Sequence, residues 1–399
     1  MLFLNAKIFD ENKGFIPGSF RTENGLFAEI IPGDGGTRLP ENGNRCGDAE
    51  LSENAGRPRD GVTDLEGACV IPGLIDIHTH GNSGADFSDG DFTGLTKMAR
   101  YYAMNGITSF APASMTLPYE KIADALACAK RFREEMPEGC SRLPGVHMEG
   151  PFFSEKRKGA QNGAYIRKPD FDAFAKLQER CAGLVKIVDV APETEGGIDF
   201  VRKAGQLARV SIAHTEADYE TACLAFDAGA GHLTHMFNAM PGIHHRNPGP
   251  VCAAAEREAV TAELICDGRH IHESVVRLAF QLMPGRICLI SDSLRCCGMP
   301  DGEYMVGGQK SILQDGAARL EDGTLAGSST NLFACMKNAI RFGIDVKEAI
   351  NAASLIPARA LGCEDRTGSI REGKYADFIV CNDRLEKKKV YLGGREITE

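Results

Sequence analysis

Two histidines one residue apart follow an apolar segment in the first quarter of the sequence. The stretch IPGLIDIHTHG (71–81) contains an apolar run that ends at Asp76 and then places His78 and His80 just before a glycine. In a β-strand, residues i and i+2 point to the same face. His78 and His80 should therefore converge on one point at the end of a strand. The pair by itself fits either a metal site or a polar strand end.

Other side chains that bind metals or transfer protons end further apolar segments. They are His147 and Glu149 in LPGVHME, His214 in VSIAH, His235 in HLTHMF, Asp267 in VTAELICDG and Asp292 in RICLISD. A single histidine at a strand end is more often a hydrogen-bonded structural residue than a ligand. Imidazole and carboxylate groups that collect at most of the strand ends are instead the donor set that Zn²⁺ or Fe²⁺ requires. The joint pattern predicts a metal centre.

Eight apolar segments of strand length must position these side chains. They cover residues 70–78, 107–113, 143–149, 184–193, 210–214, 232–237, 260–268 and 286–292. Amphipathic segments lie between them, for example 92–106, 120–136, 216–229 and 272–283. Eight apolar strands that alternate with helices are typical of an α/β protein with a parallel (β/α)8 barrel of the TIM type. Active sites of such barrels lie at the carboxyl ends of the strands, where the candidate residues stand.

The segments that flank the barrel predict a second, smaller domain. Residues 1–69 are rich in glycine, asparagine and short apolar stretches, and residues 356–399 return to short strands and turns. We expect these two segments to pair in a small β-sandwich, with the barrel spanning 70–355. Residues 33–61 are polar and punctuated by glycine and proline, which predicts an exposed, mobile loop.

The eighth strand is followed by additional structure. Residues 298–328 have the character of a hairpin excursion with glycine-rich turns. Two helical segments are expected after it, at 330–343 and 346–362.

Composition and charge argue against several classes of protein. The formal net charge of −10 and the absence of a long basic run argue against nucleic acid or a membrane surface as a partner. No apolar stretch approaches the ~20 residues that cross a bilayer, and the first residues do not resemble a signal peptide. The 14 cysteines are scattered with no CxxC pair, which favours reduced, mostly buried thiols and hence the cytoplasm.

A series of motifs adds a family resemblance. In chain order they are PGLIDIHTHG, GVHMEGPF, IAHTEA, THMFNAMPGIHHRNPG, CDGRHI, ISDS and LAGSSTNLF. This series resembles the amidohydrolase superfamily, and HMEGPF with THMFNAM resembles in particular its N-acetylglucosamine-6-phosphate deacetylases. The resemblance implies hydrolysis of the acetamide of N-acetyl-D-glucosamine 6-phosphate to D-glucosamine 6-phosphate and acetate. The N-acetylgalactosamine-6-phosphate reaction stays an alternative, because the motifs hardly separate the two epimers.

The resemblance also implies a set of metal ligands. It makes Glu149, His214 and His235 the ligands of the principal ion. In family members that keep the HxH pair, here His78 and His80, a second ion is bound there and the glutamate bridges the two. One or two ions per subunit, Zn²⁺ or Fe²⁺, are therefore expected.

Asp292 corresponds to the general acid/base of the family and is expected close to the second ion. An amide resists attack by neutral water, whereas water on a metal ion has a pKa lowered toward about 7. A carboxylate must then take the proton of the water and deliver it to the leaving nitrogen, because an amide anion leaves poorly. The alternative role for Asp292 is to orient a ligand or to cap the segment after the strand.

Substrate contacts are implied for five further positions. Asn238 and Ala239 match the positions at the sugar phosphate and the acetyl end, and Arg246 and His270 match the phosphate-binding positions. In the family the matching arginine comes from the neighbouring subunit, which implies a homodimer with shared sites. Gln161 stands where some members have a histidine; glutamine donates the same hydrogen bond but carries no charge.

Two competing interpretations remain at the level of sequence. A cyclic-amide hydrolase or deaminase on the same barrel often bridges its metals with a modified lysine at the end of strand four, but Lys186 lies near the start of that strand. A non-catalytic scaffold should have lost ligands that this chain retains. His147 is expected either behind the ligands or in the core, and Asp267 is expected to cap its turn and orient His270.

Overall fold

The computed structural model describes residues 1–33 and 61–398. The loop expected at 33–61 lies, apart from its two end residues, outside the described residues. The chain forms two compact units, Met1–Pro72 with Ser369–Thr398, and Gly73–Gly368. Residues 70–72 and 356–368 therefore fall on the other side of the boundaries expected at 69/70 and 355/356.

Eight parallel strands form the ring of the second unit, and they follow the eight segments expected from the sequence. They are β6 (Leu74–Thr79), β9 (Ile107–Pro112), β10 (Val146–Met148), β11 (Val185–Val190), β12 (Arg209–Ile212), β13 (His232–Leu233), β14 (Thr261–Ile265) and β15 (Ile287–Ile290). β6 pairs with β9, and β10 to β15 pair in chain order. Two backbone hydrogen bonds complete the ring: Ser114 donates to His147 (3.0 Å), and Asp292 donates to His78 (3.0 Å). The predicted (β/α)8 barrel is confirmed.

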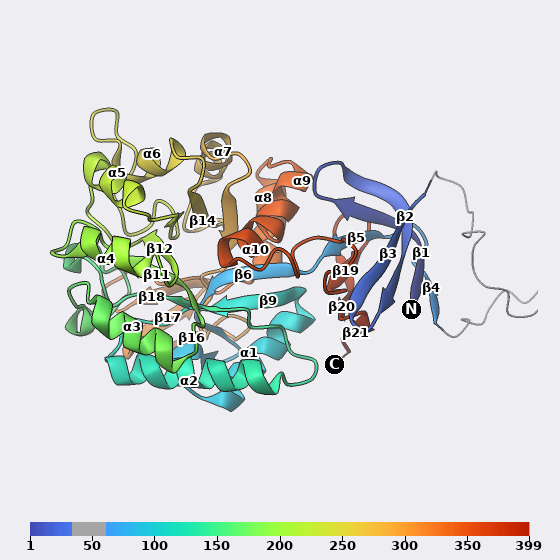
Figure 1. The fold of residues 1–399 in the computed structure, drawn as a ribbon, viewed down its shortest axis with the longest axis horizontal. Coiled ribbons are helices and arrows are strands. Elements are labelled where there is room, and N and C mark those ends of the chain that lie inside the picture. Colours follow the sequence, from blue (N-terminus) through green and yellow to red (C-terminus); the bar gives the residue numbers. More distant parts are fainter. Residues whose placement is uncertain (34–60, 399) are drawn as a thin grey trace, which may run out of the picture. The chain divides into compact units, whose positions relative to one another are not determined.

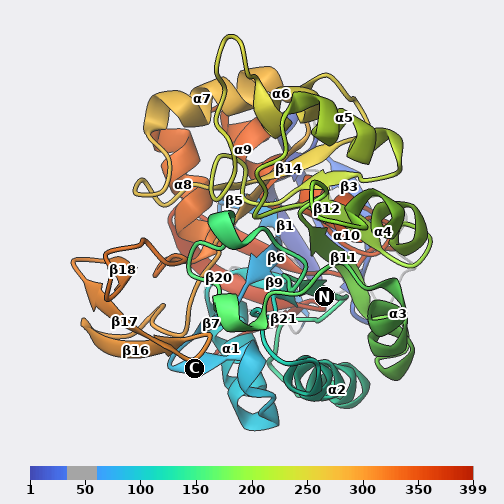
Figure 2. The ribbon, with the colours of Figure 1, turned by 90° about the vertical axis from the view of Figure 1, so that its left-hand side faces the viewer.

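Helices lie around the strands of this unit (Figure 2). They are α1 (Phe92–Met104), α2 (Tyr119–Glu135), α3 (Phe171–Arg180), α4 (Gly197–Ala204), α5 (Tyr219–Asp227), α6 (Gly249–Ala255), α7 (Glu273–Leu282), α8 (Leu332–Arg341), α9 (Val346–Ala352) and α10 (Leu355–Leu361). Asp91, Asp170 and Asp218 cap α1, α3 and α5 by accepting hydrogen bonds from amides of the first turn. Among the described residues, no helix has the length and apolarity needed to span a bilayer.

The helix expected at 346–362 is divided into α9 and α10. Ser354 lies between them with φ −139° and ψ −77°, which is not helical. Pro357 explains the division, because it has no amide hydrogen for a continuous helix and its ring would clash with the carbonyl of Ala353. In the first turn of α10 that missing hydrogen has no cost.

Short elements complete the barrel unit. They are β7 (Gly81–Asn82), β8 (Ala85–Asp86), the 3₁₀ turns η1 (Phe87–Asp89), η2 (Glu155–Arg157) and η3 (Gly163–Tyr165), and the antiparallel strands β16 (Gly302–Val306), β17 (Gln309–Gln314) and β18 (Ala317–Leu320). The last three strands form the excursion expected after the eighth barrel strand. Met115, Leu294 and Val306 belong to one apolar cluster that includes residues of this sheet.

The terminal segments pair in one sheet of the other unit (Figure 1). Its strands are β1 (Leu2–Asp10), β2 (Gly14–Glu23), β3 (Leu26–Pro32), β4 (Val62–Asp64), β5 (Cys69–Pro72), β19 (Phe378–Cys381), β20 (Lys387–Leu392) and β21 (Arg395–Glu396). The order is β21-β20-β19-β5-β1-β2-β3, and β4 pairs with β1. β5 and β19 are antiparallel, so the expected pairing of the two ends of the chain is confirmed.

Aromatic packing shows that this sheet curls over itself. β3 and β19 are four positions apart in the sheet, which would separate them by about 19 Å if the sheet were flat. The ring centroids of Phe27 in β3 and Phe378 in β19 are nevertheless only 5.9 Å apart. The two halves of the sheet therefore face each other across an aromatic core, as the predicted β-sandwich requires.

The segment expected as one strand at 70–78 is divided at Gly73. Pro72 ends β5, and Leu74 begins the barrel strand β6. A Cβ atom on Gly73 would lie 2.1 Å from Oγ1 and 2.4 Å from Cγ2 of the buried Thr108. Only glycine fits at this position without displacing its neighbour.

We expect Gly73→Ala to lower the free energy of unfolding by about 1–3 kcal/mol, because the new methyl group overpacks a buried, β-branched side chain. Denaturant or thermal unfolding measures this loss. Gly242→Ala is the matched control, since none of the described residues lies within 4 Å of a Cβ atom there. Equal stability of the two variants would contradict the interpretation of the close contact.

Candidate metal centre and active site

Glu149 lies at the centre of a buried group of side chains at the carboxyl ends of the barrel strands. Its Oε1 atom is 3.2 Å from Nε2 of His214 and 3.2 Å from Nε2 of His235, and these two nitrogens are 3.1 Å apart. All three residues are at most 5% exposed. A tetrahedral ion with bonds of about 2.1 Å has ligand–ligand distances of about 3.4 Å. The spacing of these three donor atoms therefore fits a zinc-like ion.

His78 and His80 form a second donor group around the same carboxylate. Nε2 of His80 is 3.2 Å from Oε2 of Glu149 and 3.3 Å from Oδ1 of Asp292. Nε2 of His78 is 3.5 Å from Oε1 of Glu149 and 3.7 Å from Asp292. This His78 nitrogen is buried without a hydrogen-bond partner among the described residues. A buried, unpaired acceptor nitrogen of this kind is what a metal ion would satisfy.

Charge balance in the cluster follows from its burial and its contacts. Burial would raise the pKa of Glu149, but His78, His214 and His235 hold that pKa well below its ordinary value. Burial likewise opposes ionisation of Asp292, whereas His80 and His78 lower its pKa. Both carboxyl groups are therefore carboxylates at neutral pH, the form that binds a cation or accepts a proton.

The pKa of His80 moves in the opposite direction. Burial would lower it, but the hydrogen bonds to Asp292 and Glu149 raise the pKa of His80 to about 10. Only a deprotonated imidazole nitrogen binds a metal ion, so metal binding to this group must release a proton.

Backbone strain accompanies the site. His214, His235 and Asp292 have positive φ angles of 43°, 28° and 47°. Non-glycine residues in this region are uncommon and cost of order 1–3 kcal/mol, so they persist where the surrounding structure enforces them. These three backbones turn sharply just where their strands end, and the turn directs the side chains into the cluster.

Gln161 has a defined orientation beside the cluster. Its Oε1 accepts a hydrogen bond from the backbone N–H of Thr116 (2.8 Å). The amide nitrogen therefore faces Glu149, to which Nε2 donates a hydrogen bond. Gln161 is placed as a donor toward the centre.

A cavity of about 240 Å³ opens above the cluster. It is lined by the ligand candidates other than His78, by Gln161, Asn238, Ala239 and His270, and by apolar side chains that include Leu294 and Val306. Arg246 is not among the described residues that line this cavity, and its side chain is exposed. The structure thus brings together all of the residues proposed from the sequence except Arg246.

His270 is oriented by Asp267. Nδ1 of His270 is 2.7 Å from Oδ2 of Asp267, and Oδ1 of Asp267 accepts hydrogen bonds from the backbone amides of Arg269 and His270 (2.9 Å each). The prediction that Asp267 caps its turn and orients His270 is confirmed. Burial would raise the pKa of Asp267, but the hydrogen bond and the charge interaction with His270 lower it.

Lys186 is the second residue of β11, at the opposite end from the cluster. The expectation against a bridging lysine therefore agrees with the position of this side chain.

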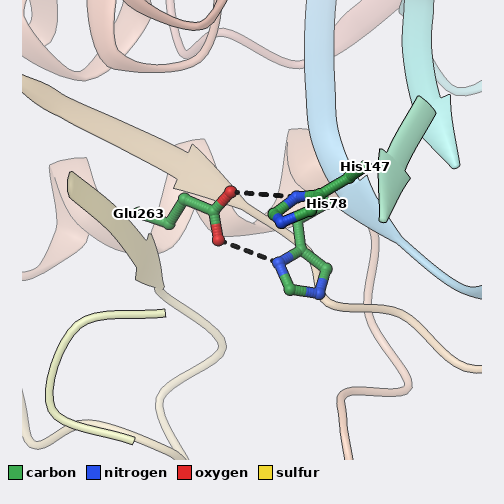
Figure 3. Close-up of side chains that lie close together, drawn as sticks. All are labelled: His78, His147 and Glu263. Carbon is green, nitrogen blue, oxygen red and sulfur yellow. Dashed lines mark hydrogen bonds and ion pairs between the residues drawn. The ribbon is translucent and has the colours of Figure 1, made fainter. Parts of the chain in front are cut away.

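Two buried carboxylates behind the cluster were not singled out in the sequence. Glu263 in β14 contacts both His78 and His147 (Figure 3), and Asp189 in β11 lies 2.8 Å from Nε2 of His147. All four side chains are fully buried. His147 therefore stands behind the ligand candidates, one of the two places expected for it. The available signal was a single acidic residue inside an otherwise apolar strand segment, AELIC and IVDVA.

Family comparison agrees with this geometry. The profile of the amidohydrolase family matches residues 69–397. The chain belongs to the amidohydrolase family. Amidohydrolases of this superfamily are metal-dependent hydrolases, and the chain carries three-residue groups of histidine and carboxylate side chains suited to metal ions.

Several amidohydrolases of known activity resemble the chain over most of its length. The N-acetylglucosamine-6-phosphate deacetylase of Bacillus subtilis (strain 168) is 38% identical over 79% of this chain and 81% of its own length. The N-acetylgalactosamine-6-phosphate deacetylase of Escherichia coli O157:H7 is 34% identical over 84% and 89%, respectively. The solved structure of a mutant N-acetyl-D-glucosamine-6-phosphate deacetylase from Mycobacterium smegmatis, in complex with N-acetyl-D-glucosamine-6-phosphate, has a TM-score of 0.87. It is 27% identical and covers 100% of this chain and 99% of that chain.

We expect Glu149→Gln to lose bound metal. The Glu149 carboxylate contacts both donor groups, and the neutral amide of a glutamine in its place is a poor ligand for a divalent cation. Metal analysis of the purified protein measures the ratio of ions to chains. Glu155→Gln, which changes an exposed carboxylate six residues away, is the control and should keep the metal content of the unmodified chain. Full metal content in Glu149→Gln would rule out this centre.

Proposed function

We propose that the protein hydrolyses the acetamide of N-acetyl-D-glucosamine 6-phosphate to D-glucosamine 6-phosphate and acetate. The observation that carries the proposal is the buried triangle of Glu149, His214 and His235, which faces a cavity that also contains Asp292. The B. subtilis relative, a deacetylase of this substrate, supports the choice of substrate.

The triangle would hold the principal ion, and His78 with His80 would hold a second one that shares Glu149. Nitrogen and carboxylate donors at this spacing favour Zn²⁺ or Fe²⁺. Such an ion supplies Lewis acidity, which polarises an amide carbonyl and acidifies water. The chain itself supplies the shape of the cavity, the hydrogen bonds and a group that moves the proton.

Asp292 is the group that we assign to the proton transfer. Its backbone is held on both sides, by donation to the carbonyl of His78 and by acceptance from the amide of Ser328 (2.6 Å). Gly327 passes so close that a Cβ atom there would lie 3.0 Å from Oδ1 of Asp292. The carboxylate takes the proton of the attacking water and delivers it to the nitrogen, so that a neutral amine leaves instead of an amide anion.

The sugar phosphate would be bound in the same cavity. Asn238, Ala239 and His270 line that space, and Gln161 offers an amide donor beside Glu149. His270 is a suitable partner for a phosphate, since its hydrogen bond and charge interaction with Asp267 raise its pKa against the effect of burial. Arg246 would complete the phosphate site of a neighbouring subunit in a homodimer.

The galactosamine epimer is the second candidate substrate. The E. coli relative, whose name specifies N-acetylgalactosamine 6-phosphate, covers 84% of the chain, compared with 79% for the B. subtilis relative. For the location in the cell we propose the cytoplasm, because the cysteines are scattered through a large chain and most of the thirteen in the described residues are buried.

Acetate release from both epimers tests the proposed reaction. We expect the metal-loaded protein to release acetate from N-acetyl-D-glucosamine 6-phosphate, and Asp292→Asn to turn over more slowly by roughly two to four orders of magnitude, because the amide accepts no proton. The ratio of kcat/KM values for the two epimers decides between the substrates.

Substrate binding and metal content serve as controls for this variant. Asp292→Asn should still bind the sugar phosphate and the principal ion. If acetate is released from neither epimer, the proposed function is refuted. A metal-replete Asp292→Asn with turnover within about threefold of the unmodified protein would assign the proton transfer to another residue.

We expect Arg246→Ala to raise KM for the phosphorylated sugar far more than for the unphosphorylated one. The reason is that a guanidinium donates two parallel hydrogen bonds to a phosphate group. Mixing Arg246→Ala with Asp292→Asn subunits should restore activity, since one site of a mixed dimer then keeps both groups. Steady-state kinetics and the activity of mixtures measure these effects.

Arg180→Ala, an exposed arginine of α3, is the control and should change neither parameter. Subunits that are shown to exchange but give no recovery above the sum of the two variants would place Arg246 outside the neighbouring site.

A further inference from the structure

Glu263 is the most heavily engaged buried carboxylate behind the metal centre. It lies in the middle of β14 and is fully buried. Oε2 is 2.8 Å from Nδ1 of His78 and accepts the backbone N–H of His235 at 3.1 Å. Oε1 is 3.2 Å from Nε2 of His232 and 3.4 Å from Nδ1 of His147. One carboxylate thus contacts one residue of each donor group, His78 and His235.

The hydrogen bond to Glu263 determines which ring nitrogen of His78 carries the proton. An ionised carboxylate has no proton to donate, so Nδ1 of His78 must be the donor in the 2.8 Å contact. The lone pair of a neutral His78 then lies on Nε2, which faces Glu149 and Asp292. With the proton on Nε2 instead, the ring would present a hydrogen where an ion must bind.

Figure 3 shows that Glu263 of β14 faces His78, and the ring of His147 stands beside the ring of His78. The contact with the backbone of His235 extends the same constraint to the principal donor group. His235, whose N–H makes this contact, has a φ angle of 28°, which is uncommon for a residue other than glycine. Glu263 therefore stabilises the turn that directs His235 into the cluster.

We propose that Glu263 is a positioning residue of the metal centre, which sets the ring orientation and the proton location of His78 and holds the backbone of His235. The inference rests on the proposed function for its catalytic meaning, although metal binding tests it without substrate. Carboxylate partners of metal-bound histidines typically change metal affinity by about 10–100-fold when removed.

Zn²⁺ titration of the full-length, metal-depleted chain against a chromophoric chelator tests this role, and metal analysis counts the ions. We expect the unmodified protein to bind two ions and His78→Ala to bind one. Glu263→Leu, which has a similar shape but no acceptor, should bind the ion at His78 and His80 about 10–100-fold more weakly. Glu263→Gln keeps one acceptor oxygen and should lie between Glu263→Leu and the unmodified protein.

Asp189→Asn is the matched control. Asp189 is a fully buried carboxylate of the same network, but it contacts His147 and Thr234 and not His78. We expect this variant to lower the melting temperature while it keeps both Zn²⁺ affinities within about twofold. If Glu263→Leu does not fold, the comparison of Glu263→Gln with Asp189→Asn carries the same test.

Two outcomes overturn the positioning role. One is an equal effect of Glu263→Gln and Asp189→Asn on Zn²⁺ affinity, which would indicate a general contribution to stability. The other is an unmodified protein that binds only one ion. Acetate release measured in parallel separates this inference from the proposed function. Loss of Zn²⁺ affinity in the Glu263 variants of a protein that deacetylates neither epimer would support the positioning role and refute the function.

Discussion

The burial of the Glu149 carboxylate is the constraint on which the carboxyl end of the barrel depends. A carboxylate removed from water is destabilised by several kcal/mol unless it is paired. Here the compensation comes from imidazoles at the ends of three different strands, with His78 in the last residues of β6, His214 after β12 and His235 after β13. These groups meet only if the ring of strands closes, so the fold and the charge cluster require each other. A divalent ion would also pair with this carboxylate.

Much of this site could be predicted because it follows the strand period. His78, His80 and Glu149 stand where an apolar run ends, and parallel strands bring such ends to one rim. The divided helix at 346–362 also had a visible cause, because Pro357 cannot continue a helix. The division of the first strand at Gly73 had a weaker signal, since the contact with Thr108 joins positions that are distant in sequence.

The remaining features depend on packing that no local pattern encodes. The positive φ angle of Asp292 is held by the neighbours of its turn. Aspartate adopts this region more readily than most residues, but no local pattern marks this position for it. The role of Glu263 could not be predicted from the sequence, because a single acidic residue inside an apolar strand has no interaction partner close to it along the chain. Its partners His78, His147 and His232 lie 31 to 185 residues away. Only the closed ring makes them neighbours.

The histidines of the centre share one design, with an exception that explains the place of Glu263. His78, His80 and His214 turn Nε2 toward the cluster and use Nδ1 for a fixing contact, with Glu263, the carbonyl of Ala113 or the carbonyl of Arg157. Nδ1 of His235 has no hydrogen-bond partner among the described residues. The ring of His235 is therefore held through its backbone, and the acceptor of its backbone N–H is again Glu263. The buried carboxylate of Glu263 can therefore orient His78 through its ring and His235 through its main chain. A displacement of Glu263 would affect both donor groups.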